Sequence, residues 1–314
     1  MTVLPIVLPI FALIAVGYIA ARFGVLSDTA QKGIAEFAFN FAMPALLFRS
    51  LATAPALQPG SGNIVFAYFG AIGLIWALAT LLTRVALQRP MIDAPTIAMV
   101  SCFGNIVMIG IPLVLAVVGP AGAAPMAVLL SIHTPLLWFT GILHQQTAEQ
   151  KGDRSTMQVA TDLGRELLRN PLLIAIATGA LWRLSGLALP SSIDSSLSLL
   201  AQAGIPCAQV ALGASLTRFA IKGQVPTLSL VLALKLLVFP AIVYLLAVKV
   251  FSVPQTAAEV ALIFAAMPAG ANAFLFAERS GRVINSTSGA VALGTLLGAV
   301  TSSLIIAGLR GLTL

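Results

Sequence analysis

Charged residues are scarce in this sequence. They make up 9% of its 314 residues, whereas apolar residues make up 59%. A soluble globular chain carries roughly 25% charged residues, so a soluble globular fold is excluded. The mean hydropathy of +1.02 is typical of a chain that crosses the membrane several times, and it leaves no stretch for a separate soluble domain.

Cysteine is also scarce, and the motifs of enzyme chemistry are absent. The two cysteines, Cys102 and Cys207, lie in apolar segments and are interpreted as packing residues that indicate no redox compartment. The nucleotide-binding pattern GxxxxGK(S/T), the zinc pattern HExxH and the hydrolase pattern GxSxG do not occur. We therefore expect no enzyme activity, no metal and no cofactor.

Apolar runs that are long enough to cross a bilayer recur along the chain. A spanning helix needs about 20 mostly apolar residues, and ten segments fit: 3–21, 31–52, 64–83, 94–118, 123–144, 171–188, 191–216, 226–248, 256–277 and 288–310. The first is expected to be a true span and not a signal peptide, because its first cation, Arg22, follows the apolar run. The polar linker at 145–170 is expected to carry one short surface helix.

Lysine and arginine fall mainly on one side of the predicted membrane. Twelve lie between spans 1–2, 3–4, 5–6, 7–8 and 9–10: Arg22, Lys32, Arg84, Arg89, Lys151, Arg154, Arg165, Arg169, Arg218, Lys222, Arg279 and Arg282. Four lie on the other side: Arg49, Arg183, Lys249 and Arg310. Because cytoplasmic loops are enriched in these residues, the 145–170 linker is expected in the cytoplasm and both termini outside. The net charge of +7 then reflects topology and gives no reason to expect nucleic acid.

The sequence contains an internal repeat. An offset of 162 relates Pro9 to Pro171, Gly17 to Gly179, Gly24 to Gly186, Asn40 to Gln202 and Pro44 to Pro206. Further along, an offset of 167 relates Asn105 to Asn272, Gly122 to Gly289 and Thr134 to Thr301. The halves, 1–144 and 171–314, then hold five spans each. An odd number of spans gives the halves opposite orientations, which is the inverted repeat of secondary transporters.

Two predicted spans contain residues that interrupt helices. GNIVMIGIP lies at 104–112 and MPAGANAF at 267–274. Glycine costs about 1 kcal/mol in a helix interior and proline about 3, and freed backbone groups survive in a membrane only where protein buries them or where they line a cavity. One such motif alone is more often a proline kink. Two in corresponding positions favour a midplane site built from discontinuous helices.

The residues of these breaks favour an anion as the ligand. Each break is expected to expose a half-helix N-terminus, which carries a partial positive charge. Asn105 and Asn272 add neutral amide donors, and neither break contains Asp or Glu. A carboxylate is the simplest anion that fits. The remaining candidate contacts are Gly104, Gly110, Pro112, Pro268 and Gly270 in the breaks, with Ser101 and Asn40 as additional contacts.

Other polar residues inside the spans have two interpretations each. Lys235 could be a functional charge, or it could cap carbonyl groups freed by a break or pair with a carboxylate. His133 could relay protons or could be a hydrogen-bonded packing residue. Arg49 is expected to extend its charge toward the membrane surface.

The run LPIVLPIFALIAVGYIAARFGVLSDTAQKGIAEFAFNFAMPALLF, together with GNIVMIGIP, KLLVFP and AAMPAGANAF, resembles the auxin efflux carrier family of membrane transporters. The resemblance covers essentially the whole chain. It implies an all-α membrane protein of ten helices in two inverted five-helix repeats, with the fourth and ninth spans broken and crossing. Spans 1, 2, 6 and 7 would form a scaffold, often a dimer interface, and spans 3–5 and 8–10 a transport domain that moves like an elevator.

The resemblance also implies the substrate class. The family's substrates are organic anions: auxin in plants, and malonate or malate in bacterial relatives. Carried over by position, Asn105 and Pro112 belong to the first crossing, and Pro268 and Asn272 to the second. The short 145–170 linker differs from the long central loop of many plant carriers, which indicates a bacterial carrier of the inner membrane. An anion channel and a carrier of a larger aromatic acid stay open as alternatives, as do the coupling ion and the direction of transport.

Overall fold

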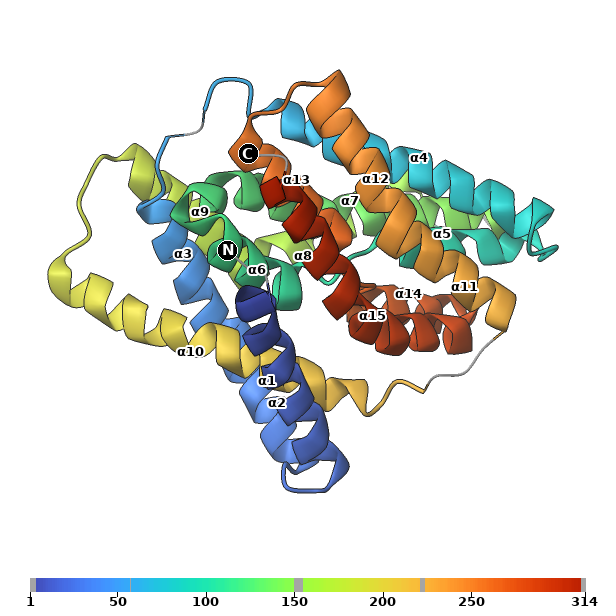
Figure 1. Cartoon of the computed structure of the whole chain (residues 1–314), viewed down its shortest axis with the longest axis horizontal. Coiled ribbons are helices and arrows are strands. Elements are labelled where there is room, and N and C mark those ends of the chain that lie inside the picture. Colours follow the sequence, from blue (N-terminus) through green and yellow to red (C-terminus); the bar gives the residue numbers. More distant parts are fainter. Residues whose placement is uncertain (1–3, 57, 150–154, 221–223, 312–314) are drawn as a thin grey trace. The chain divides into compact units, whose positions relative to one another are not determined.

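The computed structural model describes residues 4–56, 58–149, 155–220 and 224–311, and within these ranges the chain is helical apart from its connections (Figure 1). The α-helices are α1 Leu4–Arg22, α2 Asp28–Phe37, α3 Met43–Ala52, α4 Asn63–Val85, α5 Ala94–Cys102, α6 Ile111–Val117, α7 Ala123–Glu149, α8 Thr156–Leu168, α9 Pro171–Leu184, α10 Ser191–Leu216, α11 Val225–Ala233, α12 Phe239–Tyr244, α13 Gln255–Ala266, α14 Ala271–Ser280 and α15 Ile284–Gly311. Short 3₁₀ segments, η2 Met91–Asp93 and η4 Gly119–Gly122, precede α5 and α7.

Six stretches of the described chain are long and apolar enough to cross a membrane: Asp28–Ala52, Asn63–Val85, Gly119–Glu149, Ser191–Leu216, Val225–Val250 and Ile284–Gly308. Shorter apolar helices occupy the other predicted spans: Val7–Arg22, Met91–Cys102, Ile106–Val117, Pro171–Leu184 and Gln255–Ala266. The surface helix predicted in the linker is present as α8. Lys151, Arg154 and Lys222, which entered the charge count, lie outside the described residues.

The chain divides into two compact units. Unit 1 comprises Met1–Leu57, Val107–Ser131 and Glu166–Arg218, and unit 2 comprises Gln58–Ile106, Ile132–Arg165 and Phe219–Leu314. Unit 1 therefore gathers the predicted spans 1, 2, 6 and 7 and adds Val107–Ser131 from the fourth and fifth. Each unit combines segments that lie far apart in the sequence.

Glycines set the helix crossings of unit 1, where α1 packs on α10 and α3 packs on α9. Gly17 of α1 lies against the carbonyl of Val210 in α10, and Gly179 of α9 lies against the carbonyl of Phe48 in α3. A Cβ at either glycine would overlap the facing carbonyl group. Small residues let helix backbones approach closely in a membrane, where apolar side chains gain little from leaving lipid.

These two crossings follow the predicted offset of 162. That offset carries Gly17 to Gly179 and also carries Phe48 to Val210, so each contact is the counterpart of the other. Gly24 and Gly186 correspond in the same way. Both follow the end of a helix, with left-handed φ values of 73° and 69°, a conformation that glycine adopts without steric cost.

Arg49 makes a contact that the sequence did not predict. Its Nε donates to Oδ1 of Asp194 at 2.7 Å, and its guanidinium also donates to Oδ2 at 3.1 Å. Both side chains are about one-third exposed, at 37% and 34%. The prediction that Arg49 simply reaches for the membrane surface is therefore incomplete, because the guanidinium joins α3 to α10.

Three widened, π-helical turns each precede a proline by two residues. They are η1 Ala38–Ala42 before Pro44, η3 Ile106–Gly110 before Pro112, and η5 Leu234–Val238 before Pro240. Proline has no N–H to donate, and its ring crowds the carbonyl four residues earlier. A π turn makes room for that ring, and it often marks a functional position. A fourth such turn, η6 Leu245–Val250, has no proline two residues after it.

Unit 2 is built around α4 and the interrupted helices near the C-terminus. α4 packs on α5, α12 and η6, and α15 packs on α11, α13 and α14. In Figure 1, α12 lies beside α4, in agreement with these contacts. Gly298 of α15 leaves room for the ring of Pro268, since a Cβ there would lie 3.2 Å from the proline Cδ. The long helix α15 therefore supports the second interruption.

Candidate functional site

Two helices of unit 2 end at a shared extended pairing. α5 ends at Cys102 and α13 at Ala266, and the next residues, Phe103 and Met267, have extended ψ values of 100° and 138°. The N–H of Asn105 donates to the carbonyl of Pro268 at 2.7 Å, and the N–H of Gly270 donates to the carbonyl of Phe103 at 3.0 Å. Each interrupted segment thus provides hydrogen-bond partners for backbone groups that lose their helical partners in the other segment.

The first break lies earlier than the motif indicated. Gly110 is the last residue of η3, and Pro112 is the second residue of α6. Both belong to unit 1, whereas the interruption at 103–105 belongs to unit 2. The helical run continues from η3 into α6 without interruption, so Pro112 lies inside a helix that follows the break and does not form part of the break itself.

The pairing relates the two breaks by an offset that differs from the one used for the repeat. Gly104 and Ala269 form an antiparallel bridge, and its local two-fold symmetry relates Asn105 to Gly270. Asn272 lies two residues further along, as the second residue of α14. The bridge thus relates the breaks by 165 residues, two fewer than the offset of 167 that matches the two asparagines. Asn105 is in the extended segment, and Asn272 is in the first turn of a helix.

Two glycines allow the extended segments to meet. A Cβ on Gly270 would lie 3.2 Å from the carbonyl oxygen of Gly104 and 3.3 Å from the Cα of Asn105. A Cβ on Gly104 would lie 3.3 Å from both the Nζ of Lys235 and the carbonyl oxygen of Phe264. These separations are tighter than ordinary van der Waals contact, and most of the facing atoms are backbone. Glycine at 270 therefore allows the close approach of the extended segments, and glycine at 104 leaves room for the Lys235 ammonium group and the last turn of α13.

Lys235 lies beside this pairing, in the π turn η5. Its Nζ donates to the carbonyl of Ala265 at 2.9 Å and lies 4.5 Å from the ring centroid of Phe239. The side chain is buried, with 1% exposed. Within the described ranges no carboxylate lies within 4.0 Å of it. Of the interpretations left open by the sequence, capping of a carbonyl near a break is the one observed.

The position of Lys235 has an electrostatic consequence. A helix carries roughly half a negative charge at its C-terminus and half a positive charge at its N-terminus. Ala265 lies in the last turn of α13, and Gly104 follows the end of α5 by two residues. The ammonium group of Lys235 therefore offsets the negative ends of both helices.

The helix N-terminus at the pairing, with its partial positive charge, is that of α14. Gly270 is its N-cap and provides no side-chain acceptor. The N–H of Gly270 is bonded across the bridge, whereas those of Ala271 and Asn272 meet no acceptor in the described part of the chain. The Asn272 side chain is half-buried at this end. The first turn of α14 thus presents backbone and amide donors together.

His133 belongs to a buried aromatic cluster behind the bridge. Its Nδ1 lies 3.4 Å from the hydroxyl of Tyr68, and its ring centroid lies 4.9 Å from that of Phe103. Tyr68 in turn packs on Phe239, with the ring centroids 5.6 Å apart. His133 is fully buried, and its Nε2 meets no hydrogen-bond partner among the described groups. This geometry favours the packing interpretation of His133.

The other candidates lie in different places. Ser101 is buried in α5, where its hydroxyl donates to the carbonyl of Ile97 at 2.8 Å. Asn40 is exposed on η1 in unit 1. Asn105 is buried, with 7% exposed.

Among the described residues, no group of three or more His, Cys, Asp and Glu side chains is placed to hold a metal ion. Unit 2 therefore brings together Gly104, Asn105, Pro268, Gly270 and Asn272.

The family described as "Membrane transport protein" matches residues 2–306 of this sequence. The chain belongs to this family. The resemblance to the auxin efflux carriers is thereby confirmed, and this membrane transport protein is not an enzyme. A Rhizobium meliloti (strain 1021) protein named "Putative malonate transporter" is 23% identical over 296 residues, which are 94% of this chain and 92% of the relative. A Methanothermobacter thermautotrophicus protein named "Uncharacterized transporter" is 25% identical over 308 residues, 94% of each chain.

Gln209 of this membrane transport protein is not among the residues predicted from the sequence. Its Nε2 donates to the carbonyl of Met108 at 2.6 Å, and that carbonyl lies four residues before Pro112, which has no N–H to offer it. Gln209 is fully buried in α10, and all three residues belong to unit 1. The proline indicates that a carbonyl is freed, but the sequence does not indicate which amide reaches it.

Proposed function

We propose that this membrane transporter moves a small organic anion, most simply a carboxylate, by alternating access. The observation that carries the proposal is the bridge between Gly104 and Ala269, directly followed by the uncapped first turn of α14. Interrupted helices whose N-termini point at an anionic group are a recurrent binding arrangement in secondary transporters. The name of the rhizobial relative, which mentions malonate, supports a carboxylate of this size.

The proposed site holds the anion with neutral donors. Asn272 and the N–H groups that begin α14 would donate to one carboxylate, and Asn105 would donate from the extended segment. Lys235 would act from behind the bridge. Its positive charge would offset the partial negative charges at the C-terminal ends of α5 and α13. The partial positive charge at the N-terminus of α14 would then dominate the electrostatic potential at the bridge. The absence of Asp and Glu from 103–105 and 267–272 supports an anion over a cation.

The proposed architecture is ten membrane spans in two inverted repeats, with both termini outside. The paired contacts of Gly17 with Val210 and of Gly179 with Phe48 support the repeat, because one offset interchanges them. The grouping of the predicted spans 1, 2, 6 and 7 in one compact unit supports a scaffold, which we propose to be the surface of a homodimer. The helices α5, α13 and α14, which flank the bridge in unit 2, would then belong to the moving part in an elevator-type mechanism, whereas α6 groups with the scaffold in unit 1.

Counterflow in proteoliposomes tests the proposed transport. Vesicles loaded with unlabelled malonate should take up labelled malonate faster than empty vesicles, and the rate should saturate. A panel of mono- and dicarboxylates and a bulky aromatic acid, each tested as competitor, would define the substrate. Uptake that rises without saturation and is not accelerated by preloading would indicate a channel. If no carboxylate competes in folded protein, the anion assignment is wrong.

A further inference from the structure

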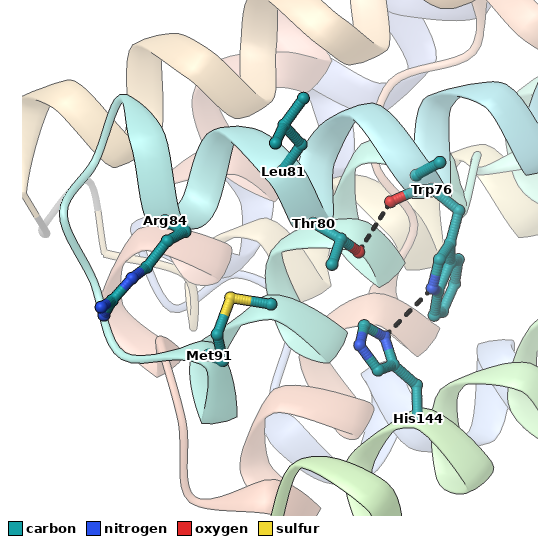
Figure 2. Close-up of a pocket in the computed structure, with 7 residues that line it drawn as sticks. Trp76, Thr80, Leu81, Arg84, Met91 and His144 are labelled. Carbon is teal, nitrogen blue, oxygen red and sulfur yellow. Dashed lines mark hydrogen bonds between the residues drawn. The ribbon is translucent and has the colours of Figure 1, made fainter.

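Unit 2 carries a second feature that could bind a ligand, a groove along the last turns of α4. Its volume is about 650 Å³, and it is lined by Trp76, Ala77, Thr80, Leu81, Arg84, Met91 and His144. Figure 2 shows Arg84 and Met91 toward one end and Trp76 and His144 toward the other. None of these residues takes part in the bridge between Gly104 and Ala269. The groove therefore needs an explanation apart from the proposed anion site.

The hydrogen bonds inside the groove fix which donors it offers. The indole N–H of Trp76 donates to Nδ1 of His144 at 3.1 Å. Because tryptophan can only donate, Nδ1 must be the acceptor, and the proton of neutral His144 lies on Nε2. The Thr80 hydroxyl is directed to the Trp76 carbonyl at 2.8 Å. The donor of His144 that the groove residues leave unused is therefore its Nε2–H.

Arg84 supplies the positive charge of the groove. It lies in the last turn of α4 and is exposed, and within the described ranges it forms no ion pair. Arg89 and Arg282, by contrast, both approach Asp93, at 2.9 and 3.9 Å. The lining of the groove contains no acidic side chain. Its chemistry is thus a cation and an N–H donor beside an apolar wall.

We propose that this groove binds an anionic phospholipid. An acyl chain would lie along Trp76, Ala77 and Leu81, and the headgroup phosphate would be held by Arg84 with help from His144. Guanidinium groups bind phosphate oxygens through paired, charge-assisted hydrogen bonds. Arg84 also belongs to the Lys/Arg-rich side of the sequence, which is predicted to face the cytoplasm, where the membrane leaflet carries anionic lipids. A free carboxylate or phosphate would use the cation but would leave the apolar wall uncovered.

Lipid retention by the full-length purified protein tests the proposal. Native mass spectrometry would count the phosphatidylglycerol and phosphatidylcholine molecules that remain bound after extraction from mixed vesicles. We expect the parent to retain phosphatidylglycerol preferentially. Arg84→Gln should weaken that retention by about tenfold or more, the size expected for a charge-assisted hydrogen bond. Leu81→Gln should weaken it as well, because it places an amide against the acyl chain.

Two control variants match these changes. Arg22→Gln removes an exposed cation at the end of α1, and Leu74→Gln alters an exposed leucine of α4, 53% accessible, that does not line the groove. Both should retain phosphatidylglycerol like the parent. Equal retention of the two lipids, or no difference between Arg84→Gln and Arg22→Gln, would overturn the proposal. Displacement of the lipid by millimolar glycerol phosphate or malonate would assign the groove to a free anion instead.

Discussion

The Nζ of Lys235 lies 2.9 Å from the carbonyl oxygen of Ala265, so a buried cation donates to the backbone of the last turn of a neighbouring helix. This contact explains how a charge is kept beside the bridge without a carboxylate partner. A buried lysine at this place could cap the helix ends, bind the substrate, or do both, and the contact with Ala265 favours the first role. We infer that Lys235 stabilises the ends of helices α5 and α13, and we propose that the donors for the anion are those of Asn105, Asn272 and the first turn of α14.

Replacing Lys235 by methionine tests this separation. Lys235→Met keeps the length of the side chain but leaves the Ala265 carbonyl without its donor, and an unsatisfied buried acceptor costs about 1–3 kcal/mol. The midpoint of thermal unfolding in detergent should fall, and anion binding should weaken. The control is Lys249→Met, which removes an exposed lysine of η6 and should change neither quantity. Equal stability of Lys235→Met and the parent would contradict a capping role.

Gly270, the residue that follows the bridge, should tolerate alanine poorly. Gly270→Ala places a Cβ 3.2 Å from the carbonyl oxygen of Gly104, so the extended segments must move apart and the donors of α14 shift. Anion affinity should fall with less effect on expression. Gly73→Ala, in α4, faces open space and should be neutral or stabilising by roughly 0.5–1 kcal/mol, as expected for a helix interior. Binding isotherms for the three proteins would check this, and unchanged affinity of Gly270→Ala would show that the close approach is dispensable.

A matched pair of variants tests the internal repeat. Gly17→Ala and Gly179→Ala each place a Cβ against a facing carbonyl, of Val210 and Phe48 respectively. Both should lower the thermal stability by similar amounts, because the two contacts are counterparts under one offset. Gly33→Ala, in α2, meets nothing within 4 Å and serves as the control. A large loss in one variant and none in the other would show that the halves do not share this packing.

The helix breaks could be predicted from the sequence because glycine and proline act locally. A helix interrupted near Gly104 and Pro268 follows from the backbone chemistry of a few residues. The pairing of the breaks could not be predicted in the same way. It depends on a bridge between Gly104 and Ala269, which lie 165 residues apart, and on hydrogen bonds such as that from Asn105 to Pro268. The sequence match of the two asparagines suggested an offset two residues longer.

The backbone carbonyl groups that accept from the buried polar side chains could not be predicted from the sequence either. Lys235 could be recognised as unusual because a cation inside a span needs a reason. Its acceptor, the Ala265 carbonyl, is set by how α13 packs on η5. Gln209 has the same property, since its acceptor on Met108 is 101 residues away. Side chains that serve a distant backbone leave no spacing pattern in a single sequence.

Membrane topology can be tested by labelling single cysteines. In a Cys102→Ala, Cys207→Ser background, Gln58→Cys and Gln158→Cys would place thiols at two exposed positions. The Lys/Arg asymmetry predicts that an impermeant maleimide applied to intact cells labels Gln58→Cys only, and that Gln158→Cys reacts after the cells are opened. Labelling of both in intact cells would contradict the ten-span arrangement.

The two asparagines give the most direct test of the proposed anion site. A hydrogen bond to a charged group contributes roughly 1.5–3 kcal/mol, so Asn272→Ala should weaken binding by about 10- to 100-fold. Asn105→Ala should also weaken it. Asn272→Asp keeps the shape but sets a like charge against the anion, so it should bind more weakly than the alanine variant while the carboxyl group is ionised. Isothermal titration of purified, monodisperse protein would measure each affinity.

The control and the double variant decide between a shared ligand and separate structural roles. Asn285 is the second residue of α15, as Asn272 is of α14, and it is exposed. Asn285→Ala should therefore bind like the parent. If Asn105 and Asn272 hold one carboxylate, the losses of the two single variants should not add in the double variant, because residues that share a partner are coupled. Additive losses would indicate that the two amides act independently, and parent-like affinity in both folded single variants would place the anion away from the bridge.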